Sequence, residues 1–237
     1  MFLYNPTYLI FMIPALILMG ITSWYVKHSY NKWSQVRAGS GLTGQQAAQR
    51  LISNGNLYGV QVQGTQGELS DHYDPRDKTL YLSNSVANSP SVASVAVAAH
   101  ELGHAMQDAE EYFPLRFRAA LVPVVSIGSN LGWVLIMVGL VFLRSTSLGL
   151  NIAWLGVLFF AGGALFALAT LPVELDASAR AKQLLRQTNI IQTDEEQRGV
   201  NQVLNAAALT YVAGLVTAVL QLLYYVLLVG GGGRRRG

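Results

Sequence analysis

The chain has 237 residues, of which 51% are hydrophobic and only 12% are charged. This balance is too apolar for an ordinary soluble domain and predicts a mainly α membrane protein with several spans. The net charge is only +3 and the Lys and Arg residues are scattered, so we expect no nucleic-acid partner, while the lack of cysteine excludes disulfides and thiolate zinc sites.

The first apolar stretch, residues 8–26, is long enough to cross a bilayer. No Lys or Arg precedes it and no small-residue cleavage site follows, so we expect a retained anchor rather than a cleaved signal peptide. Lys27, Lys32 and Arg37 follow directly. By the positive-inside rule, these charges predict that the C-terminal end of this span faces the cytoplasm.

The polar region over residues 28–118 predicts a small α+β domain on the cytoplasmic side. Thr43 is suited to cap a short helix that ends near Gly55. The strands predicted after it comprise residues 60–63, 68–73 and 79–83. The last two flank the turn at residues 74–78 and should form a hairpin. We hypothesise that the strand over residues 79–83 binds substrate as an added β-strand.

The sequence His-Glu-Leu-Gly-His occupies residues 100–104, within a helix expected over residues 91–109. Positions i and i+4 share a helix face, so His100 and His104 can bind one Zn²⁺ ion. Glu101 is then the expected general base, which takes a proton from a zinc-bound water. From the motif alone, a structural pair of histidines stays open as the alternative.

Three further spans are predicted, and they comprise residues 119–143, 150–173 and 206–229. The second and third of the four spans form a tight hairpin, so the polar helical segment at residues 174–205 returns to the side that holds His100. Both termini are then outside the cytoplasm. Residues 230–237 are expected to form a flexible basic tail.

Two acids, Glu174 and Asp176, follow the third span directly, where charge is costly unless it has a use. A catalytic zinc usually has three protein ligands and a water, and Glu174 is the best candidate for the third ligand. On a helix Asp176 points about 200° away from Glu174, so one face cannot present both acids to one ion. The alternative is that Glu174 and Asp176 simply lie at the membrane interface.

His72 and Tyr73 in the hairpin are candidate donors to the oxyanion of the reaction intermediate. A lone histidine in a hairpin is more often structural or solvated.

Several segments resemble the YugP-type zinc-dependent membrane metallopeptidases of bacteria. These are Asn5-Pro6-Thr7-Tyr8, Leu69-Ser70-Asp71-His72-Tyr73-Asp74-Pro75, Ala99-His100-Glu101-Leu102-Gly103-His104-Ala105 and Leu171-Pro172-Val173-Glu174-Leu175-Asp176-Ala177-Ser178. The resemblance covers nearly the whole chain and is more distant to the HtpX and CAAX-protease group. It implies a gluzincin-like endopeptidase of the bacterial inner membrane, with one zinc per chain and Glu174 as third ligand.

In that wider group an acid four residues after the third ligand orients a zinc-binding histidine. Ser178 stands at this position here, and the nearby acid is Asp176. Both residues are therefore candidates to orient a histidine from behind the ligands.

The function expected is zinc-dependent hydrolysis of peptide bonds in membrane-associated or unfolded proteins on the cytoplasmic side. The partners are then the lipid bilayer and protein or peptide substrates, and the oligomeric state stays open. The main alternative is an inactive zinc-binding scaffold or adaptor, which requires a fourth protein ligand such as His72.

Two other classes fit the sequence less well. A protease acting within the bilayer needs its histidines inside a span, but the apolar segment before His100 is too short to cross. A metal transporter needs polar groups near mid-membrane, but the predicted spans contain no His, Asp or Glu.

Overall fold

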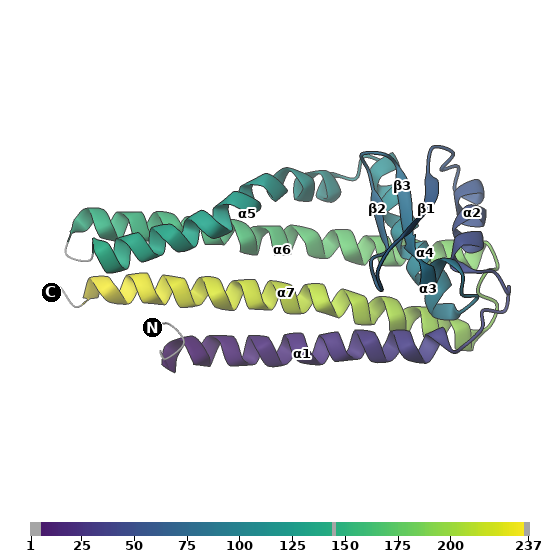
Figure 1. The fold of residues 1–237 in the computed structure, drawn as a ribbon, viewed down its shortest axis with the longest axis horizontal. Coiled ribbons are helices and arrows are strands. Elements are labelled where there is room, and N and C mark those ends of the chain that lie inside the picture. The colour runs from purple at the N-terminus through teal and green to yellow at the C-terminus, as the bar shows by residue number, and fades with distance from the viewer. Residues whose placement is uncertain (1–5, 144–145, 235–237) are drawn as a thin grey trace. The chain divides into compact units, whose positions relative to one another are not determined.

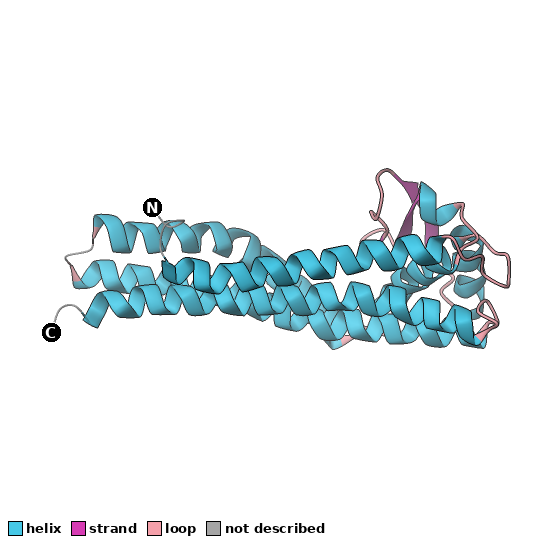
Figure 2. Cartoon of the chain, turned by 90° about the horizontal axis from the view of Figure 1, so that it is seen from below, coloured by secondary structure: helices cyan, strands magenta, loops and turns pink. Residues whose placement is uncertain are grey.

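The computed structural model describes residues 6–143 and 146–234. Asn5 of the N-terminal motif, Arg144 and Ser145 after the second predicted span, and residues 235–237 of the predicted tail lie outside the described residues. Helices dominate the described chain and strands occur in one short part of it (Figure 2).

Among the described residues, four helices are long and apolar enough to cross a membrane, by length and composition. They are α1 (Pro6–Ser34), α5 (Phe113–Met137) with its π-helical continuation η2 (Val138–Phe142), α6 (Ser147–Gln187) and α7 (Asp194–Arg234) (Figure 1). The predicted mainly α membrane fold is thereby confirmed. The helices extend beyond the predicted spans: α6 runs through Pro172, and α7 continues through residues 230–233, where the sequence predicts a flexible tail.

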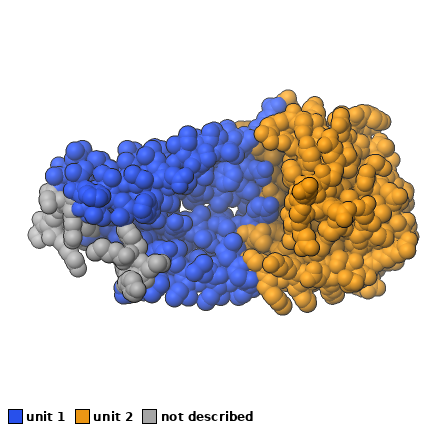
Figure 3. Space-filling model, in the orientation of Figure 1, with its two compact units in different colours: residues 1–21, 116–171, 211–237 blue, residues 22–115, 172–210 orange. Residues whose placement is uncertain are grey.

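The chain divides into two compact units (Figure 3). The apolar unit comprises residues 1–21, 116–171 and 211–237, and the sheet unit comprises residues 22–115 and 172–210. Within the apolar unit, α5 and α6 approach closely at Gly132 and Gly156. A Cβ at Gly132 would lie 2.9 Å from the carbonyl oxygen of Gly156, so small residues are required for this helix packing. Tyr8 on α1 packs edge-on against Tyr224 on α7.

The sheet unit contains one three-stranded sheet with the order β1-β3-β2. Its strands are β1 (Gln61–Thr65), β2 (His72–Asp74) and β3 (Thr79–Ser83). The predicted hairpin is confirmed, since β2 pairs antiparallel with β3 and places His72 opposite Tyr81.

The hypothesis that β3 binds substrate as an added strand is wrong. β1 pairs parallel with β3 along all five residues, and β2 occupies the other side over Thr79, Leu80 and Tyr81. β3 is therefore the central strand and has no open edge at those residues.

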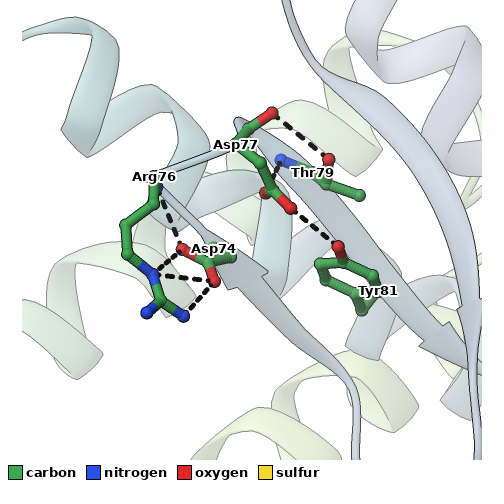
Figure 4. Close-up of polar contacts among 5 residues, drawn as sticks. All are labelled: Asp74, Arg76, Asp77, Thr79 and Tyr81. Atoms are coloured by element: carbon green, nitrogen blue, oxygen red, sulfur yellow. Dashed lines mark hydrogen bonds and ion pairs between the residues drawn. The ribbon is translucent and has the colours of Figure 1, made fainter.

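The turn between β2 and β3 is fixed by its own acids (Figure 4). Asp74 accepts hydrogen bonds from the backbone and guanidinium of Arg76, the shortest at 2.6 Å, and these bonds lower the pKa of Asp74 to about 2. Asp77 accepts from the Thr79 amide and from the Tyr81 hydroxyl. The turn residues predicted from composition therefore hold the hairpin through side-chain to backbone bonds.

Three helices lie wholly within the sheet unit, beside the ends of α1, α6 and α7: α2 (Gly44–Asn54), α3 (Asn84–Ala87) and α4 (Val92–Ala109). Thr43 caps α2 as predicted, in a reciprocal capping box with Gln46. Ser91 caps α4, and its side chain accepts a hydrogen bond from the Ser94 amide. The core gathers Leu51 of α2 and Leu80 of β3 around α4, whose residues from Val92 to Ala96 are all buried.

Candidate metal centre

The two histidines of the motif lie on the buried helix α4. His100 and His104 are one turn apart, and their rings meet edge to face with centroids 4.9 Å apart. Their side chains are only 12% and 13% exposed. The hydrophobic residues around them on α4 fix the helix in the core, so packing positions the two histidines.

Glu174 reaches this pair from α6 and is 3% exposed. Its Oε2 lies 3.3 Å from His100 Nε2 and 3.5 Å from His104 Nε2. One ligand atom from each of the three residues lies within 4.8 Å of the other two. The structure thus brings together the three residues that the sequence marks as candidate ligands.

The spacing of Glu174 from each histidine fits zinc. A tetrahedral ion with bonds of about 2.0–2.1 Å to nitrogen or oxygen separates its ligand atoms by about 3.4 Å. The two contacts of Glu174 lie close to this value. Two imidazoles and one carboxylate are also a donor set that catalytic zinc sites use.

Burial and the charges around the site shift the pKa values of His104 and Glu101 on α4. Burial lowers the pKa of His104, but the contact with Glu174 and the charge of Glu101 outweigh burial, so this pKa lies above its ordinary value. Burial raises the pKa of the Glu101 carboxyl, and the two histidines act in the opposite direction. The raised pKa of Glu101 suits a group that must take up a proton near neutral pH.

Each histidine contacts a side chain through its other ring nitrogen, Nδ1. Ser178 Oγ lies 3.2 Å from His100 Nδ1, and Gln107 Oε1 lies 3.0 Å from His104 Nδ1. Such contacts behind metal ligands orient the imidazole rings. Ser178 therefore lies where a histidine-orienting residue must lie.

Asp176 meets the histidines indirectly. Its Oδ2 accepts a hydrogen bond of 2.8 Å from Gln107 Nε2. No sequence motif includes Gln107. Its only sequence signal is a polar side chain three positions after His104, which places it on the same helix face.

The hairpin candidates contact other groups. His72 is exposed, with Nδ1 2.8 Å from the Ser70 carbonyl oxygen and its ring stacked on Tyr81. The Tyr73 hydroxyl donates to Asp108 Oδ2 at 2.9 Å, and burial together with this carboxylate raises the pKa of Tyr73. Neither residue belongs to the three-residue group, so their part in oxyanion binding stays a prediction.

Comparison with known proteins agrees with the chemistry of this centre. The family model described as "Putative neutral zinc metallopeptidase" matches residues 8–230. The chain is 40% identical over 219 residues to "Putative membrane protease YugP" of Bacillus subtilis (strain 168), an alignment that covers 91% of this chain and 94% of that protein. No solved structure matches.

The family match spans most of the chain and includes α4 and α6, which carry the candidate ligands. The family description names zinc and peptide hydrolysis, and the relative's name places a protease in a membrane. The resemblance seen in the sequence motifs is thereby confirmed, and the chain belongs to the family described as "Putative neutral zinc metallopeptidase".

Proposed function

We propose that this protein is an integral membrane zinc endopeptidase of the gluzincin type, which cleaves membrane-associated or unfolded proteins at the cytoplasmic side. The observation that carries the proposal is the convergence of His100, His104 and Glu174 within 4.8 Å, with Glu101 next to the first histidine. Metal-assisted hydrolysis needs these three donors and a base beside them.

A zinc ion held by His100, His104 and Glu174 would supply Lewis acidity, which makes a bound water more acidic and polarises a peptide carbonyl. Glu101 is the base in this scheme. Its carboxylate takes the proton of the attacking water and then delivers it to the leaving amine. Partial burial of Glu101 supports this role, because it raises the pKa toward the range in which a carboxyl both accepts and releases protons.

Other features of the site support catalysis over a closed structural site. The group that the structure brings together offers three ligands, and His72, the candidate fourth, contacts Ser70 and Tyr81. A three-ligand site leaves a position for water or substrate.

The cytoplasmic side is proposed from charge. Lys27, Lys32 and Arg37 flank the first apolar helix, and Arg180, Lys182 and Arg186 lie beyond the apolar part of α6. Both groups belong to the sheet unit, so one orientation satisfies the positive-inside rule for both.

The test is Glu101→Gln in the full-length protein in detergent, with an unfolded protein as substrate. We expect the variant to keep its zinc and fold and to lose about two to four orders of magnitude in cleavage rate, the usual contribution of general acid–base catalysis. Glu68→Gln makes the same change at an exposed acid in the loop before β2 and should cleave at the wild-type rate.

Cleavage by Glu101→Gln at the wild-type rate would exclude Glu101 as the base. A wild-type protein that binds zinc and cleaves no protein substrate would instead support the inactive scaffold.

A further inference from the structure

Gln107 is a fully buried polar residue on α4, and it makes three polar contacts. Its Nε2 donates to the carbonyl oxygen of Val173 at 2.8 Å and to Asp176 Oδ2 at 2.8 Å. Its Oε1 lies 3.0 Å from His104 Nδ1. The Gln107 side chain thus connects His104, a candidate zinc ligand, to Val173 and Asp176 on α6.

The orientation of this amide follows from its partners. A backbone carbonyl and a carboxylate only accept hydrogen bonds, so the two groups on α6 must face the NH₂ of Gln107. Arg180 also donates to Asp176 from its Nε, which lies 2.6 Å from Oδ2. The carbonyl oxygen of Gln107 is therefore the atom that faces His104.

An amide oxygen only accepts, so His104 Nδ1 must carry a hydrogen and donate it. In the neutral ring this leaves the lone pair on Nε2, the nitrogen that lies 3.5 Å from Glu174. We infer that Gln107 is a positioning residue that holds His104 in the zinc-binding tautomer, and that Asp176 acts on His104 through this amide.

The other histidine is held differently. Ser178 Oγ faces His100 Nδ1, and a hydroxyl can either donate or accept. This contact allows both tautomers of His100. The two histidines therefore differ. The tautomer of His104 is fixed before the metal binds, whereas His100 can change its tautomer when the ion binds.

Arg180 connects Asp176 to the residues that follow α4. Arg180 also pairs with Glu110 through Nη1 at 2.8 Å and lies over the ring of Tyr112 at 5.8 Å. The carboxylate of Asp176 is therefore held in place by the residues that follow α4, and the amide of Gln107 has a fixed acceptor. Asp176 influences zinc binding through this geometry without being a ligand.

The inference rests on the proposed zinc site, and its test compares zinc dissociation constants of full-length variants by competition with a chelator. Gln107→Met keeps the length of the side chain and removes every polar contact. We expect zinc binding about 10- to 100-fold weaker, the usual effect of losing a partner behind a metal-ligating histidine.

A spectroscopic readout follows the ring proton directly. The chain has only four histidines, so ¹⁵N-histidine spectra of the zinc-loaded protein can be assigned by single substitutions. The His104 Nδ1–H should exchange slowly with water in wild type and faster in Gln107→Met. Ser178→Ala should affect the His100 ring proton and leave that of His104 unchanged.

Zinc binding by Gln107→Met at wild-type strength would overturn the inference. The same holds if the His104 ring proton is unaffected by Gln107→Met. Failure of the wild type itself to bind zinc would instead overturn the proposed function, so the two failures are distinguishable.

Discussion

Gly103 on α4 lies directly against the backbone of Ala177 on α6. A Cβ at Gly103 would be 2.5 Å from the Ala177 carbonyl oxygen and 2.9 Å from its Cα. Gly103 lies within the histidine motif, and Ala177 follows Glu174 by less than one helical turn. The absent side chain therefore lets α6 approach α4 closely enough for Glu174 to reach both imidazoles.

Replacing Gly103 with alanine should disturb this approach. The added methyl meets backbone atoms that cannot rotate away, and overpacking of this kind costs about 1–3 kcal/mol. We expect Gly103→Ala to lower the thermal unfolding midpoint and to weaken zinc binding. The matched control is Gly163→Ala on α6, where a Cβ meets nothing within 4 Å. A Gly103→Ala variant with wild-type stability and zinc affinity would contradict the close approach.

The third ligand can be identified by comparing two acids on α6. Glu174→Ala removes the carboxylate that contacts both histidines and should lose most zinc affinity. Asp176→Asn leaves Glu174 in place and acts only through Gln107, so we expect a smaller loss, about 10- to 100-fold. Zinc content and dissociation constants in the same detergent check both. Zinc lost from Asp176→Asn but retained by Glu174→Ala would reverse the assignment.

Local sequence patterns predicted much of what lies near the site. The N-cap at Thr43 was predicted from neighbouring residues alone, and the structure confirms it and adds Gln46 as the partner in a capping box. The spacing of His100 and His104 follows from helix geometry alone. Glu174 stood out because charge at the end of an apolar run is costly, and the structure places it beside both histidines.

Features that depend on distant partners were missed. Gln107 matters because of its hydrogen bonds to Val173 and Asp176 on α6, which lie 66 and 69 residues away in the sequence. No local sequence pattern predicts such contacts. The central position of β3 was missed for the same reason. The hairpin with β2 is local, but the parallel pairing with β1 requires the chain to return over a longer path.

The hairpin turn should respond to acid. Arg76 holds the pKa of Asp74 at about 2, below the ordinary value of 3.8. A carboxyl with a lowered folded-state pKa stabilises the fold above its unfolded pKa, and this contribution is lost as the pH falls from about 4 to about 2.

Carboxyl NMR titration of Asp74 checks this pKa. Arg76→Gln should return it toward the ordinary value, whereas Lys78→Gln removes a charge from the same turn but not the hydrogen bonds to Asp74. An Asp74 pKa that is the same in wild type and Arg76→Gln would show that the guanidinium is not its cause.

The proposed sidedness can be mapped with single cysteines, because the chain contains none. Pro75→Cys lies in the hairpin turn and Glu195→Cys lies in the first turn of α7, and both positions are exposed. Both should react with an impermeant thiol reagent only after the cytoplasmic face is opened. Labelling of either one from outside intact cells would contradict the four-span arrangement with a cytoplasmic site.

The central claim is that His100, His104 and Glu174 together hold one zinc ion. The most direct measurement is the metal content of the full-length protein, purified without chelator, beside the His100→Ala variant. We predict one zinc per wild-type chain and little in His100→Ala, because two ligands bind far more weakly than three. A well-folded wild-type protein that retains no zinc and cannot be reloaded with it would contradict the account.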